Sequence, residues 1–375
     1  MERLHRNPRN TLNLVLSGGG IKGIAYVGVF EAAEKRGYRW GNIAGVSAGA
    51  LAGSFVSAGY SVQEIRAIMD AFDFGGLELE EVSKKVSSMY RFPQPGSDTR
   101  NYGTMNVYQF LEQLPGDETR ATGPSNDTFT SYRSGMIKKA VTFSQEGHVF
   151  DGDGLEEWVW KTLERRGIRT FGDLRGGMAD KVNPRGYKVR MTAVDATKGR
   201  VIVLPDDMAD YGMDPDRMEV AKAVRMSTSV PFAFKPVEIK VKKEEMTRVH
   251  YIVDGGVFDN FPFWLIENSN VYRKVGFRLD GGEKKLLSWD APLNLFKSLV
   301  AAVHDIGIPK KSYNSGLVAN IDTSKVSFLD FNLGEEEKEY LMKAGNRSAS
   351  FLLGKIKNME MYRRRRGLTF RLPRL

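Results

Sequence analysis

A serine between closely spaced glycines is the first feature of the sequence that could do chemistry. Residues 45–49 read GVSAG, which is the one match to GxSxG in the chain. This spacing is typical of a nucleophile on a tight strand-to-helix turn, where the glycines allow close backbone approach. The helix N-terminus there favours negative charge that develops during a reaction. The pattern predicts that Ser47 is a nucleophile, although a glycine-rich turn can also contain a serine by chance.

A second glycine-rich stretch precedes this serine. Residues 18–23, GGGIKG, match GxGxxG and lie between an apolar strand-like run and a helix-like run. A dinucleotide site needs an acidic residue about 20 positions further on, and the sequence between Glu34 and Glu64 has none. A phosphate-binding P-loop is also disfavoured, because no GK[ST] follows. We therefore expect neither NAD nor ATP to be a cofactor.

A nucleophilic serine needs a base, and the candidates after Ser47 are His148, His250, His304 and Asp254. The histidines lie in a polar loop, a strand pattern and an amphipathic helix pattern, settings in which a histidine is more often structural. Asp254 ends a strand pattern and is followed by two glycines. If burial raised its pKa, this carboxylate could accept a hydroxyl proton, although DGG is also an ordinary turn.

The predicted elements place these motifs at the ends of strands. Residues 11–16 form a buried strand pattern, 21–36 a helix, 40–46 a second strand, and a small-residue helix follows Ser47. Ser61 and Glu64 form an S-x-x-E capping box for the next helix. A helix at 151–167, strands within 188–204, 247–254 and 273–279, and a helix at 293–307 follow. Residues 335–359 predict a helix pair or one long broken helix.

This alternation predicts an α/β fold with a central, mainly parallel sheet flanked by helices. No repeat or clear linker divides the chain. The expected organisation is an N-terminal tail (1–10), a catalytic domain (11–285) with a lid or insertion (75–135), a helical extension (286–360) and a basic tail (361–375).

Composition excludes several other classes of site. The chain of 375 residues has no cysteine, so disulfides, thiolate zinc sites and a cysteine nucleophile are excluded. We expect no metal, because the DGDG at 151–154 lacks the spacing of a calcium loop. Residues 40–63 are uncharged, but their many glycines and serines predict a buried helix and not a membrane span. The N-terminus has no signal-peptide pattern, which predicts a cytoplasmic protein; export as an effector stays open.

Positive charge gathers at the end of the sequence. The net charge is +9, and no acidic residue follows Glu360. The tail contains Arg363, Arg364, Arg365 and Arg366 among leucine and phenylalanine side chains. Such a tail predicts peripheral contact with anionic lipid, with a solvated tail as the alternative. We do not expect nucleic acid to be the partner.

Taken in order, the motifs SGGGIKG, GVSAG and DGG resemble the patatin-like phospholipases, whose pattern is GGGx[KR]G, GxSxG and DG[GA]. The block at 224–237 with Ser227 and Pro231, the helix at 155–174, and Asn260 and Pro262 after DGG also resemble that family. The resemblance covers about residues 11–280. Three departures are a serine before the glycines where plant members have aspartate, Lys22 in place of arginine, and residues 114–135, to which no role is assigned.

The resemblance implies a three-layer patatin-like fold and a lipid acyl hydrolase of phospholipase A or lysophospholipase type. It implies a catalytic dyad of Ser47 and Asp254, without histidine or cofactor, that forms an acyl-enzyme. It also implies an oxyanion hole formed by the backbone amides of Gly18, Gly19 and Gly20, with Lys22 fixing this loop or contacting a lipid phosphate. Five further glycines support the motifs: Gly23, Gly45, Gly49, Gly255 and Gly256.

Two alternatives to this function stay open at the level of sequence. The same core could belong to a catalytically silent or autoinhibited protein that binds a membrane or a partner. An activating protein partner is also compatible with the sequence. A nucleotide-binding enzyme is the third hypothesis, and it predicts saturable binding of NAD or ATP.

Overall fold

The computed structural model describes residues 10–71, 150, 152–231, 233–243, 246–269, 272–281, 317–326 and 333–365. The predicted lid at 75–135, the predicted helix at 293–307, His148, His304 and Arg366 lie outside these residues. The predicted domain boundaries therefore stay predictions.

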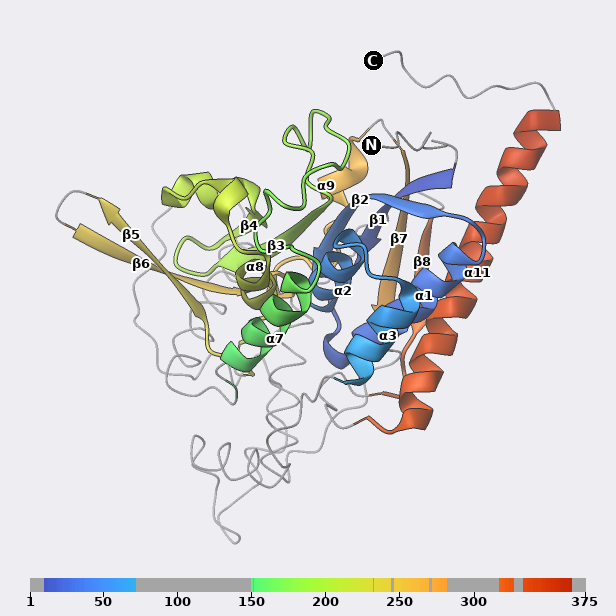
Figure 1. The fold of residues 1–375 in the computed structure, drawn as a ribbon, viewed down its shortest axis with the longest axis horizontal. Coiled ribbons are helices and arrows are strands. Elements are labelled where there is room, and N and C mark those ends of the chain that lie inside the picture. The colour runs from blue at the N-terminus through green and yellow to red at the C-terminus, as the bar shows by residue number, and fades with distance from the viewer. Residues whose placement is uncertain are drawn as a thin grey trace, which may run out of the picture.

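An eight-stranded sheet forms the centre of the described fold (Figure 1). Its strands are β1 (Thr11–Leu16), β2 (Arg39–Val46), β3 (Val189–Asp195), β4 (Arg200–Leu204), β5 (Val237–Lys243), β6 (Met246–Asp254), β7 (Arg273–Asp280) and β8 (Val318–Asp322). They lie in the order β5-β6-β3-β2-β1-β7-β8, with β4 paired to β3. The centre, from β3 to β8, is parallel, and β4, β5 and β6 pair in antiparallel fashion. The predicted α/β fold with a mainly parallel sheet is confirmed.

Helices flank this sheet. They are α1 (Ala25–Glu34), α2 (Ala48–Ser57), α3 (Val62–Asp70), α7 (Asp153–Glu164), α8 (Val220–Ser227), α9 (Trp264–Glu267) and α11 (Glu335–Arg365). The 3-10 helices are η2 (Gly20–Ile24), η4 (Asp206–Tyr211), η5 (Pro215–Arg217) and η6 (Gly255–Val257). Leu14 and Leu16 of β1 join the large core that contains α1 and α2, whereas Val15 packs with the segment around α9. The alternation of side chains along β1 thus joins one helical layer to each face.

Local sequence signals begin and orient several of these helices. The predicted capping box is present at α3, where the Glu64 amide donates to Ser61 Oγ (3.3 Å) and the Ser61 amide donates to Glu64 Oε2 (2.9 Å). The helix predicted at 21–36 starts as η2 and becomes α-helical at Ala25. Neither alternative for residues 335–359 is correct, because α11 is one unbroken helix.

Close packing on α1 explains why Gly345 does not break α11. A Cβ atom on Gly345 would lie 1.9 Å from the Ala25 carbonyl oxygen, and one on Gly28 would lie 1.9 Å from the Met342 carbonyl oxygen. The two backbones therefore approach each other at positions where no side chain fits. Tertiary contact compensates for the low helix propensity of glycine there. None of the helices in the described ranges is both long enough and apolar enough to span a bilayer.

Candidate active site

Ser47 occupies the turn between β2 and α2, as the GxSxG pattern predicts. Its φ and ψ angles are 52° and −122°, and it is the one non-glycine residue with positive φ in the described part of the chain. A Cβ atom on Gly45 would lie 2.5 Å from the Gly49 carbonyl oxygen, and one on Gly49 would lie 2.3 Å from that of Leu16. Both glycines are therefore required by close backbone approach, and the serine itself takes up the strain.

A second serine holds the backbone of Ser47 in this strained turn. The Ser47 amide donates to Ser227 Oγ (2.9 Å), and the Ser227 hydroxyl donates to the carbonyl oxygen of Thr192 on β3 (2.7 Å). Ser227 ends α8 and is fully buried. Its hydroxyl therefore satisfies a backbone donor that the turn removes from the regular hydrogen-bond ladder.

The glycine loop after β1 lies directly against Ser47. A Cβ atom on Gly18 would lie 3.1 Å from Ser47 Cβ and 2.3 Å from Asn260 Oδ1. One on Gly19 would lie 2.4 Å from Leu279 Cδ1, and Gly20 has a φ of +55°. Gly18 and Gly19 therefore have no room for a side chain, and Gly20 adopts a backbone conformation that residues with a side chain rarely adopt.

The backbone amides of this loop are not equivalent. The Gly18 amide donates to the Asn260 carbonyl oxygen (3.3 Å), and the Lys22 amide donates to the Gly19 carbonyl oxygen (3.2 Å). The amides of Gly19 and Gly20 have no acceptor among the described residues. Of the three glycines expected to form an oxyanion hole, these two have amides that are available to an anion. The Lys22 side chain is half-buried on η2.

A buried hydroxyl pair fixes the start of the loop. The Tyr26 hydroxyl donates to the Ser17 carbonyl oxygen (2.6 Å), and Ser17 Oγ accepts from the Leu279 amide (2.9 Å). Tyr26 is fully buried, and this burial raises the pKa of its phenol well above the ordinary value. The phenol therefore stays protonated and remains a donor. Ser17 opens the SGGGIKG motif, but nothing in the sequence indicates that Tyr26 pairs with it.

Asp254 reaches the same region from β6. It pairs with Ala193 of β3, while Thr192 pairs with Val46 just before Ser47, so the register brings both residues to the same level. Asp254 is buried, and its Oδ1 accepts from the Gly256 amide (2.6 Å). Its own amide donates to the Ser229 carbonyl oxygen (2.9 Å). The end of α8 therefore holds the backbone of Ser47 through Ser227 and that of Asp254 through Ser229.

Asn260 joins the two predicted residues. A Cβ atom on Gly256 would lie 3.0 Å from Asp254 Oδ1 and 2.9 Å from Asn260 Oδ1. Asn260 Oδ1 is buried and accepts no hydrogen bond from the described residues. Because Asn260 also contacts Gly18, one series of contacts runs from Ser47 to the carboxylate of Asp254.

The histidine that the structure describes lies in a different cluster. His250 Nδ1 is 2.9 Å from Asp195 Oδ2, which also accepts from the Tyr211 hydroxyl (2.6 Å). The His250 and Tyr211 rings pack edge to face, with 5.2 Å between their centroids. His250 precedes Asp254 by four residues on an extended strand, or about 13 Å. These contacts are those of a structural histidine.

The fold and the sequence together define the class of protein. The family model described as patatin-like phospholipase matches residues 14–266, about two thirds of the chain. The chain belongs to the patatin-like phospholipase family.

Two relatives illustrate the similarity in sequence. The chain is 30% identical over 344 residues to the uncharacterized protein YqhO of Bacillus subtilis (strain 168), covering 90% of this chain and 97% of that protein. It is 22% identical over 259 residues to the probable lipid hydrolase 463L of Invertebrate iridescent virus 6, covering 68% and 63% of the two chains.

Solved structures with similarity to this chain include VipD from Legionella pneumophila, with a TM-score of 0.47, 17% identity, and coverage of 92% of this chain and 67% of that one. Another is the complex of ExoU with SpcU from Pseudomonas aeruginosa, with a TM-score of 0.37, 18% identity, and coverage of 92% and 52%.

Proposed function

We propose that this protein is a lipid acyl hydrolase in which Ser47 is the nucleophile and Asp254 is the general base. The observation that carries the proposal is the convergence of a strained GxSxG serine, a glycine loop with two available amides, and a buried aspartate. The packing contacts of Asn260 connect all three. Membership of the patatin-like family supports lipid as the substrate class.

In the first half-reaction the Asp254 carboxylate accepts the proton of the Ser47 hydroxyl as Oγ attacks the ester carbonyl carbon. The resulting oxyanion accepts hydrogen bonds from the Gly19 and Gly20 amides, which are fixed before the substrate arrives. The carbon–oxygen bond to the alcohol then breaks, and Asp254 returns the proton to the departing oxygen. The products are an acyl-enzyme on Ser47 and a free alcohol or lysolipid.

In the second half-reaction water replaces the alcohol. Asp254 accepts a proton from that water as its oxygen attacks the acyl carbon, and the same two amides stabilise the second oxyanion. Cleavage of the bond to Oγ returns the proton to Ser47 and releases the fatty acid. We propose membrane glycerophospholipids as substrates, so that the activity is of phospholipase A or lysophospholipase type.

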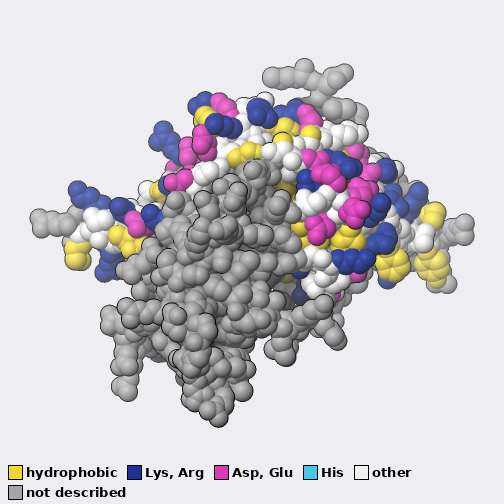
Figure 2. All heavy atoms as spheres, turned by 90° about the horizontal axis from the view of Figure 1, so that it is seen from below, with side chains coloured by type: hydrophobic (Ala, Val, Ile, Leu, Met, Phe, Trp, Pro, Cys, Tyr) yellow, Lys and Arg dark blue, Asp and Glu magenta, His cyan; other side chains and the backbone are white. Residues whose placement is uncertain are grey.

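Contact with the lipid surface belongs to the same proposal. The exposed fractions of large apolar side chains on the distal half of α11 are 64% for Phe351, 43% for Met359, 46% for Met361 and 55% for Tyr362. Figure 2 shows hydrophobic and basic side chains together at that end of the molecule. The sequence continues with arginines 363–366. We propose that this end holds the enzyme on anionic lipid, with about 1 kcal/mol from each basic residue near the surface.

Labelling and turnover test the proposed chemistry. We expect a fluorophosphonate probe to label the wild-type protein, and the protein to release fatty acid from phosphatidylcholine vesicles that contain phosphatidylglycerol. Ser47→Ala should lose both signals while keeping the wild-type circular dichroism spectrum. Undiminished turnover by that variant would refute the proposal. Absence of labelling together with tight vesicle binding would favour the alternative of a catalytically silent membrane-binding protein.

A further inference from the structure

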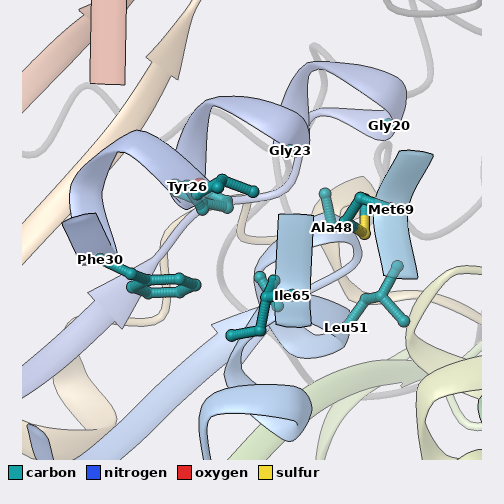
Figure 3. A pocket seen from close by; sticks show the side chains of 10 residues that line it. Gly20, Gly23, Tyr26, Phe30, Ala48, Leu51, Ile65 and Met69 are labelled. Carbon is teal, nitrogen blue, oxygen red and sulfur yellow. The ribbon is translucent and has the colours of Figure 1, made fainter. Parts of the chain in front are cut away.

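An apolar slot lies beside the glycine loop, enclosed by α1, α2 and α3 (Figure 3). Its lining includes Gly20 of η2, Ala48, Leu51 and Ala52 of α2, and Ile65 and Met69 of α3. The cavity has a volume of about 20 Å³, which is room for roughly one water-sized group in the structure as it stands.

One end of this slot lies at the proposed chemistry. Gly20 carries one of the two available amides, and Ala48 directly follows Ser47. Figure 3 shows Gly20, Ala48 and Met69 at one end and Phe30 at the other. In the acyl-enzyme, the carbonyl carbon is bonded to Ser47 Oγ and its oxygen lies at the amides. The acyl chain is the remaining substituent on that carbon. It therefore starts next to the end of the slot formed by Gly20, Ala48 and Met69, which we call the mouth of the slot.

The lining suits a hydrocarbon and not a polar group. Every residue that lines the slot is glycine or apolar except Tyr26, whose hydroxyl already bonds to Ser17. A water in this cavity would have at most the Gly20 amide as a partner, fewer than the roughly two to four that a buried water needs, whereas each buried methylene contributes about 0.8 kcal/mol. We infer that this slot is the acyl subsite, which binds the methylenes of the fatty acid nearest the scissile ester. This inference rests on the proposed function.

The wall formed by α3 is the one that can yield to a longer chain. Ile65 is the one buried side chain of α3, whereas eight residues of α1 and nine of α2 are buried. Exposed ion pairs hold α3 to the rest of the molecule, Arg66 with Glu339 and Glu64 with Arg166. Such pairs contribute little at the surface. Longer chains therefore enter by displacing α3, and side chains at positions 52 and 69 set the length preference.

The test compares ester substrates that differ in chain length alone. We would measure kcat/KM for p-nitrophenyl acetate and p-nitrophenyl octanoate, both below micelle-forming concentrations, and the labelling rates of short-chain and long-chain alkyl fluorophosphonates. Ala52→Leu fills the slot and should lower the octanoate-to-acetate ratio by about tenfold or more. Met69→Ala opens the mouth and should raise that ratio. The matched control is Ala67→Leu on the exposed side of α3, which should leave the ratio unchanged.

The outcomes separate this inference from the proposed function. Unchanged ratios in Ala52→Leu and Met69→Ala, with acetate turnover and labelling intact, would overturn the acyl subsite and leave the serine hydrolase standing. An equal loss of both esters in folded Ala52→Leu would overturn it too, because acetate does not reach the slot. If Ala52→Leu fails to fold, Met69→Ala decides, since it removes atoms and overpacks nothing. Wild-type turnover by Ser47→Ala would instead defeat the proposed function itself.

Discussion

Two buried aspartates on neighbouring strands, Asp195 of β3 and Asp254 of β6, have different surroundings. Asp195 Oδ2 accepts from the Tyr211 hydroxyl and lies 2.9 Å from His250 Nδ1, while Oδ1 accepts from the Lys198 amide (2.9 Å). Asp254 Oδ1 accepts from the Gly256 amide, and the residues packed around it lead to the glycine loop.

The difference shows that the type of partner alone does not identify a catalytic acid or base. Asp195 and His250 have the residue types of a triad, but the tyrosine beside them makes a closed hydrogen-bonded cluster. Asp254 accepts from the Gly256 amide, and the sheet register places it level with the strained serine turn. Position relative to the available amides, and not the presence of histidine, distinguishes the proposed catalytic aspartate from the structural one.

The largest expected difference between the two aspartates is in turnover. Asp254→Asn removes the proposed base and should lower kcat by at least about 10²-fold, in line with the usual contribution of general bases. Asp195→Asn should keep kcat within a few fold of wild type. Steady-state release of fatty acid from the two purified variants measures this contrast. Equal losses in both folded variants would remove the distinction.

Ser227→Ala should have the next largest effect. It leaves the buried Ser47 amide without its acceptor, a change that costs about 1–3 kcal/mol. If the loss of this acceptor displaces Ser47, kcat falls by about tenfold while KM changes little. Ser227→Thr keeps the hydroxyl and should restore part of the loss. A variant that loses thermal stability but keeps wild-type kcat would show that Ser227 serves folding alone.

The Asp195 cluster should affect stability and not catalysis. His250→Phe keeps the aromatic volume but leaves Asp195 with one buried partner fewer, which should cost about 1–3 kcal/mol in the free energy of unfolding. Fluorophosphonate labelling should continue at the wild-type rate. Denaturant titration and labelling kinetics on the same preparation check both statements. A folded His250→Phe protein that no longer labels would make histidine part of the machinery.

The smallest expected effect is at Tyr26, whose hydroxyl bonds to Ser17 at the start of the glycine loop. Tyr26→Phe removes the buried hydroxyl that donates to the Ser17 carbonyl oxygen and lies 3.1 Å from Ser17 Oγ, and each such hydrogen bond is worth about 1 kcal/mol. Burial raises the pKa of this phenol, so the folded state holds its proton more tightly than the unfolded state does. Its contribution is therefore complete below the unfolded pKa of about 10 and is lost as pH rises above that value. Thermal melts should show a steeper alkaline loss of stability in wild type than in Tyr26→Phe.

Much of the fold could be predicted because its signals are local. The β1 strand, the Ser61 capping box and the strands around residues 196–199 follow from short patterns of apolar, polar and turn-forming residues. The unbroken course of α11 could not be predicted in this way. Gly345 lowers local helix propensity, and the contact with α1 that compensates comes from residues more than 300 positions away.

In the candidate site, too, some residues can be recognised from local sequence spacing and others cannot. Gly45, Ser47, Gly49 and the glycines at 18–20 are recognisable because one tight turn imposes its own spacing on the sequence. Three other residues of the site follow no such spacing. Thr192 and Ser229 accept hydrogen bonds through their backbone carbonyl oxygens, which any residue type provides, and Tyr26 acts through a single hydroxyl. Their roles exist only where separate strands and helices meet.

The sequence by itself determined the fold class, the family motifs and the residue types available for chemistry, because these depend on short-range spacing. The tertiary structure decided which amides of the glycine loop are available and which aspartate lies level with Ser47. Sheet register and the packing of α8 control both, and these depend on contacts between distant segments. A strand shifted by one residue would turn Asp254 to the other face while leaving every motif in the sequence intact.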